Sequence, residues 1–152
     1  MAQVVLSNGI NIEYDTMGDP SNPTLLWIMG FTAQMTAWDE NFLKMYVDRG
    51  FHVVRFDNRD CGLSYKHDGV MVETDKVTMQ AAMGETVTVP VPYTLSDMAA
   101  DAIGVLDHLG IEKAHVIGAS MGGMIAQTVA IEHGHRVKSL TSIMSVPGDL
   151  AY

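Results

Sequence analysis

The sequence predicts an α/β fold in which a mostly parallel sheet begins with an antiparallel hairpin and carries helices on both faces. Three observations lead to this fold class. Apolar runs typical of strands buried on both faces alternate with segments of helical spacing. An Asn-Gly pair joins the first two strand patterns, as in a hairpin. The length of 152 residues suits a single domain spanning 1–152.

The first strands are short, and turn residues separate them. Asn8-Gly9 lies between strand patterns at 4–6 and 11–14, and this dipeptide strongly favours a two-stranded hairpin. After the turn at 19–23, residues 24–29 form a continuous apolar run, which is typical of a strand buried on both faces.

A helix is predicted next, over residues 36–49, with Gly50 at its end. The side chains expected on its apolar side are Trp38, Phe42, Met45 and Tyr46. A second buried strand follows at 52–57. The spacing then becomes irregular, and 58–93 is expected to form a long functional loop or a small cap, with a short strand at 86–89 as an option.

The periodic pattern returns in the second half of the chain. Residues 94–109 have helical spacing and are followed by Gly110, which favours a helix end. The remaining predicted elements are a strand at 114–118, a helix at 121–133 and a sixth strand at 139–144.

Composition and charge exclude several classes of function. The net charge of −9, without a cluster of basic residues, argues against nucleic acid or an anionic membrane as partner. The single cysteine, Cys61, rules out an internal disulfide and fits a reducing compartment. We see neither a signal peptide at the start nor an apolar run of about 20 residues, so we expect a cytoplasmic protein. No metal-ligand spacing or phosphate loop is present, and no cofactor is expected.

The most informative motif is Gly118-Ala119-Ser120-Met121-Gly122, followed by Gly123. It joins a predicted buried strand to a predicted helix. A serine on such a sharp turn exposes its hydroxyl, and the helix N-terminus beyond it favours negative charge. This arrangement suits a nucleophile that attacks a carbonyl carbon.

Four ordered motifs resemble those of the α/β-hydrolase superfamily, most closely its esterase branch of the aclacinomycin methylesterase type. The motifs cover essentially the whole chain and lie at 27–31, 55–60, 93–101 and 118–123. The resemblance implies that Ser120 is the nucleophile and that the backbone N–H groups of Phe31 and Met121 form the oxyanion hole. Met29-Gly30 replaces the His-Gly of many relatives, which is expected to change the shape of the substrate pocket more than the mechanism.

The resemblance also implies that the chain holds only the N-terminal half of the fold, through the sixth strand. Family members place their acid and their histidine after later strands, so the general base is not accounted for. Of the six histidines, only His67 is expected near the active edge, and a solvated loop residue is the simpler interpretation of it. Asp149 follows the sixth strand, where some hydrolases carry their acid.

Other chemical groups near this edge have structural interpretations. Asp57, Arg59 and Asp60 are expected to hold the loop beside the oxyanion strand through hydrogen bonds and ion pairs, with acid–base chemistry as the alternative. Cys61 has no positioned partner in the sequence and is expected to be a loop cysteine.

Three functions remain open from the sequence. The first is a serine hydrolase of small carboxylic esters, with its base supplied by another chain or an atypical residue. The second is a non-catalytic binding module of the same fold, and the third is a fragment of a longer esterase. Because an exposed edge at the sixth strand favours association, a homo-oligomer or a complementing second chain is expected.

Overall fold

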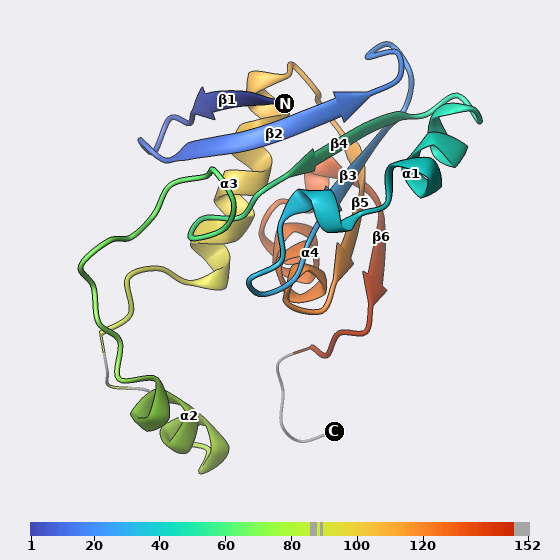
Figure 1. Cartoon of the computed structure of the whole chain (residues 1–152). Helices are drawn as coiled ribbons and strands as arrows, with labels where there is room; N and C mark the ends of the chain where they lie inside the picture. Colours follow the sequence, from blue (N-terminus) through green and yellow to red (C-terminus); the bar gives the residue numbers. More distant parts are fainter. Residues whose placement is uncertain (86–87, 89, 148–152) are drawn as a thin grey trace.

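A six-stranded sheet in the order β1-β2-β4-β3-β5-β6 forms the centre of the protein (Figure 1). The computed structural model describes residues 1–85, 88 and 90–147. The strands are β1 (Ala2–Val5), β2 (Asn11–Met17), β3 (Thr24–Ile28), β4 (His52–Phe56), β5 (Ala114–Ala119) and β6 (Val137–Ile143). Strands β4, β3, β5 and β6 run parallel, whereas β2 is antiparallel to both of its neighbours. The predicted α/β fold class is therefore confirmed.

The opening hairpin forms around the Asn-Gly pair, as predicted. The Leu6 N–H donates to the Ile10 carbonyl, and the Gly9 N–H donates back to the Leu6 carbonyl. Gly9 has a φ of 83°, a left-handed conformation that glycine adopts without steric cost. The bounds differ from the predicted strands at 4–6 and 11–14, because β1 spans Ala2–Val5 and β2 continues to Met17.

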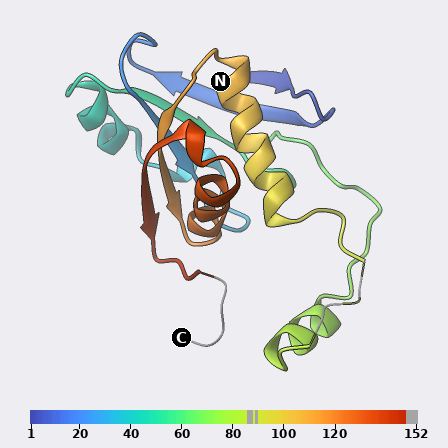
Figure 2. The ribbon, with the colours of Figure 1, turned by 180° about the vertical axis from the view of Figure 1, so that it is seen from behind.

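Helices cover both faces of the sheet. Figure 2 shows α3 (Leu95–His108) and α4 (Met121–Glu132) together on one face, and α1 (Glu40–Val47) lies on the other. Two apolar cores result. The larger core packs α3 and α4 against alternate side chains of the strands, and the smaller one packs Leu43 of α1 against Trp27 and Val53. Because both faces of the sheet are buried, the central strands form continuous apolar runs in the sequence.

The first helix differs from the prediction for 36–49. A short 3-10 turn at Met35–Ala37 comes first, and α1 begins only at Glu40. The Asp39 carboxylate sets this start, because it accepts a hydrogen bond from the Phe42 N–H as an N-cap. The fully buried residue is Leu43, whereas Met45, expected on the apolar side, is 50% exposed.

The helix α3 closely matches the prediction for 94–109. Thr94 and Asp97 form a reciprocal capping box, which satisfies two backbone N–H groups at the helix start. The buried side chains Met98, Ala102 and Leu106 recur every four residues and face the core. Helical spacing and end signals agree in this segment, and the element was therefore predictable.

The segment 58–93 contains one element that the sequence pattern did not reveal. Helix α2 (Thr74–Ala82) stands apart from the body, near the edge at which the parallel strands end (Figures 1 and 2). Met71, Met79 and Met83 on or beside it are exposed. Most of the strand considered at 86–89 lies outside the described residues. In the part of the chain that the structure describes, no helix is long and apolar enough to cross a membrane.

Candidate active site

Three loops meet at the carboxyl ends of β3, β4 and β5, the edge at which α/β sheets bind ligands. The loop after β3 lies directly against the Ser120 turn. A Cβ atom placed on Gly30 would be 3.0 Å from the Ser120 Cβ and 3.4 Å from its Oγ. Gly30 therefore allows backbone to pass within contact distance of the serine hydroxyl.

Ser120 occupies a strained turn between β5 and α4. Its φ of 55° and ψ of −125° are unusual for a residue with a side chain, at a cost on the order of 1–3 kcal/mol. A hydrogen bond of 2.8 Å from its N–H to the Ile143 carbonyl at the end of β6 helps to hold the turn. Serine at a helix N-cap often caps the helix, but the Ser120 hydroxyl makes no capping bond and the residue is exposed. The hydroxyl is thus available to a ligand.

The glycines of this motif provide space for the turn. A side chain on Gly122 would lie 2.7 Å from the Met29 carbonyl oxygen, and one on Gly118 would overlap the backbone of Gly122. On the next residue, Gly123, a Cβ would lie 2.7 Å from the Ser145 Oγ. The first turn of α4 therefore packs directly against the ends of β3 and β6.

Phe31 follows Gly30, which contacts Ser120, and Met121 follows Ser120 directly. Within the described residues, neither the Phe31 N–H nor the Met121 N–H donates a hydrogen bond to another protein group. Phe31 is followed by Thr32, whose φ of 60° turns the loop and whose hydroxyl donates to the Phe31 carbonyl at 2.7 Å. Met121 begins α4, where the helix dipole adds positive potential. Such unpaired donors beside a hydroxyl suit a developing oxyanion.

Buried polar contacts fix the loop after β3. The Asp57 carboxylate accepts hydrogen bonds from the backbone N–H of Met35 at 2.7 Å and of Leu63 at 3.2 Å. The Asn58 side-chain amide donates to the Met29 carbonyl at 2.8 Å. The structural role predicted for Asp57 agrees with these contacts. The sequence carried no signal for Asn58, because its partner lies 29 positions away along the chain.

A buried ion pair connects the loop after β4 to α3. The Arg59 guanidinium donates to both carboxylate oxygens of Asp101, at 2.7 and 2.8 Å, and Asn8 donates to the same carboxylate at 2.9 Å. Burial alone would lower the pKa of Arg59, but the bonded Asp101 outweighs this effect and raises the pKa above its usual value. Arg59 therefore keeps its charge, and its contacts with Asp101 tie three distant segments together.

A cavity of about 370 Å³ opens beside the serine turn. It lies between the loop after β3, the loop after β4 and the start of α3. Its lining residues are Gly30, Phe31, Thr32, Asn58, Arg59, Asp60, Cys61, Tyr93, Met98 and Met121. Of Met29 and Gly30, the pair expected to shape the substrate pocket and bind substrate, Gly30 lines this cavity and Met29 does not. The mixed apolar and polar lining fits a small organic ligand.

The predicted candidates for base and acid do not join the serine here. Among residues 1–85, 88 and 90–147, the histidine rings that form hydrogen bonds contact Tyr14, Thr24 and Ser139, and none contacts the Ser120 hydroxyl. The His67 ring lies between the rings of Tyr65 and Tyr93, 5.8 and 6.3 Å from their centroids, and does not line the cavity. Asp149 lies outside the described residues. The general base therefore remains unassigned within the described part of the chain.

The other histidines occupy the positions that the topology predicted. His52 is the first residue of β4 and contacts the Thr24 hydroxyl, and His115 is the second residue of β5 and contacts the Ser139 hydroxyl. His108 ends α3, and the two remaining histidines follow α4. All five belong to elements or ends that point away from the Ser120 turn.

Cys61 lines the cavity but is poorly suited to attack a substrate. Its thiol is buried and lies 3.0 Å from the Ala33 carbonyl, to which it donates. Burial and the nearby negative charge of Asp57 raise the pKa of the Cys61 thiol, which disfavours the reactive thiolate. Within the described ranges, no group of three or more His, Cys, Asp or Glu side chains could hold a metal ion.

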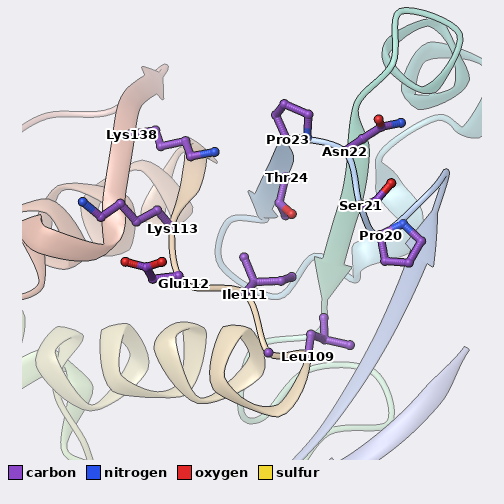
Figure 3. A pocket seen from close by; sticks show the side chains of 11 residues that line it. Pro20, Ser21, Asn22, Pro23, Thr24, Leu109, Ile111, Glu112, Lys113 and Lys138 are labelled. Atoms are coloured by element: carbon purple, nitrogen blue, oxygen red, sulfur yellow. The ribbon is translucent and has the colours of Figure 1, made fainter.

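A second cavity, of about 380 Å³, lies at the opposite end of the parallel strands, where β3, β5 and β6 begin. Figure 3 shows that its lining side chains come from the turn before β3, the connection between α3 and β5, and the start of β6. It is separated from Ser120 by the length of the parallel strands and contains none of the four motifs found in the sequence. The cavity beside Ser120 is therefore the candidate active site.

A family model for the α/β hydrolase fold matches residues 23–152. The chain belongs to this family. Rhodomycin D methylesterase DnrP of Streptomyces peucetius is 28% identical over 142 residues, which are 93% of this α/β hydrolase chain and 41% of the relative. Epoxide hydrolase A of Mycobacterium tuberculosis is 23% identical over 145 residues, or 95% of this chain and 38% of that protein.

A solved hydrolase structure from Pseudomonas aeruginosa superimposes with a TM-score of 0.69 at 26% identity. The match covers 91% of this chain and 43% of that one. The α/β hydrolase chain thus spans about two fifths of the length of the relatives it matches.

Proposed function

We propose that this α/β-hydrolase chain provides the nucleophile and oxyanion donors of a serine hydrolase that acts on carboxylic esters. The observation that carries the proposal is the Ser120 turn. Its left-handed backbone exposes the hydroxyl, and Gly30 packs against the same residue. The similarity to a methylesterase over 93% of the chain supports an ester as the substrate.

The geometry supports one order of chemical events. The Ser120 Oγ attacks the ester carbonyl carbon while its proton passes to a base, and the carbonyl oxygen becomes an oxyanion. The N–H groups of Phe31 and Met121 stabilise this oxyanion without reorganising, an effect worth about 10²–10³ in rate for each donor. The alcohol then leaves with a proton, and water releases the acid from Ser120.

The base is proposed to come from polypeptide outside the described residues, either of this protein or of a second chain. The lining of the cavity beside Ser120 supports this proposal, since it includes no histidine of the described residues. Loss of the histidine from a serine-protease triad lowers kcat about 10⁶-fold, but binding and the oxyanion hole retain about 10³–10⁴ over water. The purified 152-residue chain should consequently be a slow esterase.

Chemical rescue tests this proposal. Hydrolysis of p-nitrophenyl acetate is measured with and without added imidazole, which replaces a missing histidine side chain as base. Ser120→Ala reports the background reaction of imidazole with the ester, and Ser7→Ala, an exposed serine on the hairpin, is the matched control. We expect imidazole to accelerate the wild type and Ser7→Ala beyond the background set by Ser120→Ala.

The other outcomes separate the alternatives. Equal rates for wild type and Ser120→Ala at every imidazole concentration would contradict the nucleophile and favour a binding module. Ser120-dependent activity without imidazole that disappears in His67→Ala would assign the base to His67. Labelling by a fluorophosphonate, followed by mass spectrometry of the Ser120 peptide, identifies the reacting atom independently of turnover.

A further inference from the structure

Asp60 has a backbone conformation that is uncommon for a residue with a side chain. Its φ is 63°, in the left-handed region where glycine is favoured, and the next glycine along the loop is Gly62. Aspartate is among the residues that tolerate this region best, yet the position still favours glycine. Two hydrogen bonds to the side chain stabilise Asp60 in this conformation.

The Asp60 carboxylate fastens both ends of the segment 66–93, which contains α2. One oxygen accepts a 2.6 Å hydrogen bond from the His67 backbone N–H, at the start of the segment. The other accepts a 2.6 Å bond from the Tyr93 hydroxyl, at its end. A third bond, from the Asp60 N–H to the Tyr65 carbonyl at 2.8 Å, holds the aspartate itself.

Tyr93 is held from a second direction. The guanidinium carbon of Arg59 lies 5.0 Å from the centre of its ring, and Arg59 is fixed by its ion pair with Asp101. Asp60, Arg59 and Tyr93 all line the cavity beside Ser120, as does the thiol-bearing Cys61. The Tyr93 ring consequently forms a wall of this cavity whose position depends on the two residues that hold it.

We propose that Asp60 is a positioning residue that fastens the 66–93 segment and holds Tyr93 in place, and thereby limits the size of the group that the cavity admits. The inference deepens the proposed function, since the cavity would receive one side of the ester. The proposed effect of Asp60 on the width of the cavity, however, can be measured without catalysis.

The electrostatics agree with a permanent contact at neutral pH. Burial disfavours ionisation of Asp60, but the bonds from His67 and Tyr93 outweigh this and hold its pKa below the usual value. Burial and the bond to the Asp60 carboxylate raise the pKa of Tyr93 to about 12. Donor and acceptor therefore keep their charge states across the physiological range.

Cys61, the only cysteine of the chain, provides a probe of cavity width that does not depend on activity. The rates of its modification by methyl methanethiosulfonate and by the bulkier benzyl methanethiosulfonate are compared. Their ratio cancels changes in the fraction of thiolate, since both reagents attack by the same chemistry. Tyr93→Phe removes only the hydroxyl, Asp60→Asn preserves the shape, and Tyr65→Phe is the matched control.

We expect the ratio of bulky to small reagent rates to rise about tenfold in Tyr93→Phe, the factor that one hydrogen bond to a charged group supports. Asp60→Asn should raise it as well, and Tyr65→Phe should retain the wild-type ratio. Asp60→Gly relaxes the backbone and removes both bonds, and should give the largest rise. Thermal melts of each variant confirm that the protein remains folded.

Two results would overturn the inference. One is an unchanged ratio in Tyr93→Phe and Asp60→Asn, and the other is a rise confined to Asp60→Gly, which would be a backbone effect on the adjacent Cys61. The measurement is repeated in Ser120→Ala, where the ratios should be the same. If the wild type shows no Ser120-dependent esterase activity, with or without imidazole, the proposed function is refuted. A higher reagent ratio in Tyr93→Phe and Asp60→Asn would still support the role of Asp60 in that case.

Discussion

At the scale of single residues, Asp101 and Asp107 illustrate how burial determines the contribution of an ion pair to stability. Both carboxylates belong to α3 and both pair with an arginine at 2.7 Å. Asp101 is 2% exposed, whereas Asp107 is 60% exposed. A surface ion pair contributes about 0–1 kcal/mol, but removal of one partner from a buried pair leaves the other charge without compensation.

Asp101→Asn should therefore lower the free energy of unfolding by about 3–5 kcal/mol, because Arg59 would stay buried without its counter-charge. Asp107→Asn is the matched control on the same helix and should lower it by less than about 1 kcal/mol. Urea denaturation followed by circular dichroism measures both. Equal losses in the two variants would contradict a special role for the Arg59–Asp101 pair.

The glycines of the serine motif allow a second comparison. Gly122→Ala would place a Cβ against the carbonyl oxygen of Ile28 in β3 and 2.7 Å from that of Met29, whereas Gly134 has open space around the same position. We expect Gly122→Ala to lower the free energy of unfolding by about 1–3 kcal/mol through overpacking. Gly134→Ala should change it by about 0.5 kcal/mol or less. Denaturant melts measure this, and similar effects at the two positions would contradict the close packing of α4 on β3.

The site residues differ in whether the sequence alone can predict their roles. The Ser120 turn was predictable because its strand, glycines and helix are contiguous. Asn58 and Asp60 act on groups that are distant along the chain, at Met29 and Tyr93, so only the folded backbone reveals their roles. The same limit applies to Arg59, whose structural role was predicted although its partner Asp101 was not.

At the scale of elements, α3 and α2 show why one helix was predicted and the other was not. In α3 the apolar side chains recur at helical spacing because they pack against the sheet. In α2 the acidic residue of the first turn and the following Gly84, with a φ of 68°, are helix signals. No described side chain of α2 belongs to either core, so no apolar stripe marked the segment.

The start of β4 should make the stability of the sheet depend on pH. His52 is 3% exposed and contacts the Thr24 hydroxyl across to β3. Burial lowers its pKa below 6.5, an effect that the negative charge of Asp19 opposes in part. The unfolded chain then binds the proton more tightly, so stability is complete above about pH 6.5 and decreases as the pH falls toward the folded-state pKa.

We predict that His52→Asn reduces the slope of the unfolding free energy against pH below about pH 6.5. The same substitution at His135, which is exposed, is the matched control. Urea titrations at several pH values give the slope for each variant. A slope in His52→Asn that equals the wild-type slope would show that the buried imidazole does not cause the dependence.

At the scale of the whole molecule, the two edges of the sheet differ. One edge is the short strand β1, whereas the other is the seven-residue β6, whose five central residues are exposed. Within the described residues β5 is the only neighbour of β6. Leu140 in this strand is 40% exposed. An exposed strand without proline presents unpaired backbone groups to any other polypeptide strand.

This edge leads us to predict that the purified 152-residue chain self-associates at micromolar concentrations through β6. Thr141→Lys places a charge at the centre of the strand and should weaken association by about tenfold, because pairing would bury an uncompensated ammonium group. Ala100→Lys adds the same charge at an exposed position of α3 and should not change it. Size-exclusion chromatography with light scattering over a concentration series measures the equilibrium. A monomer at every concentration would refute the prediction. If both lysines weaken association equally, the cause is the change in net charge, and the β6 edge has no specific role.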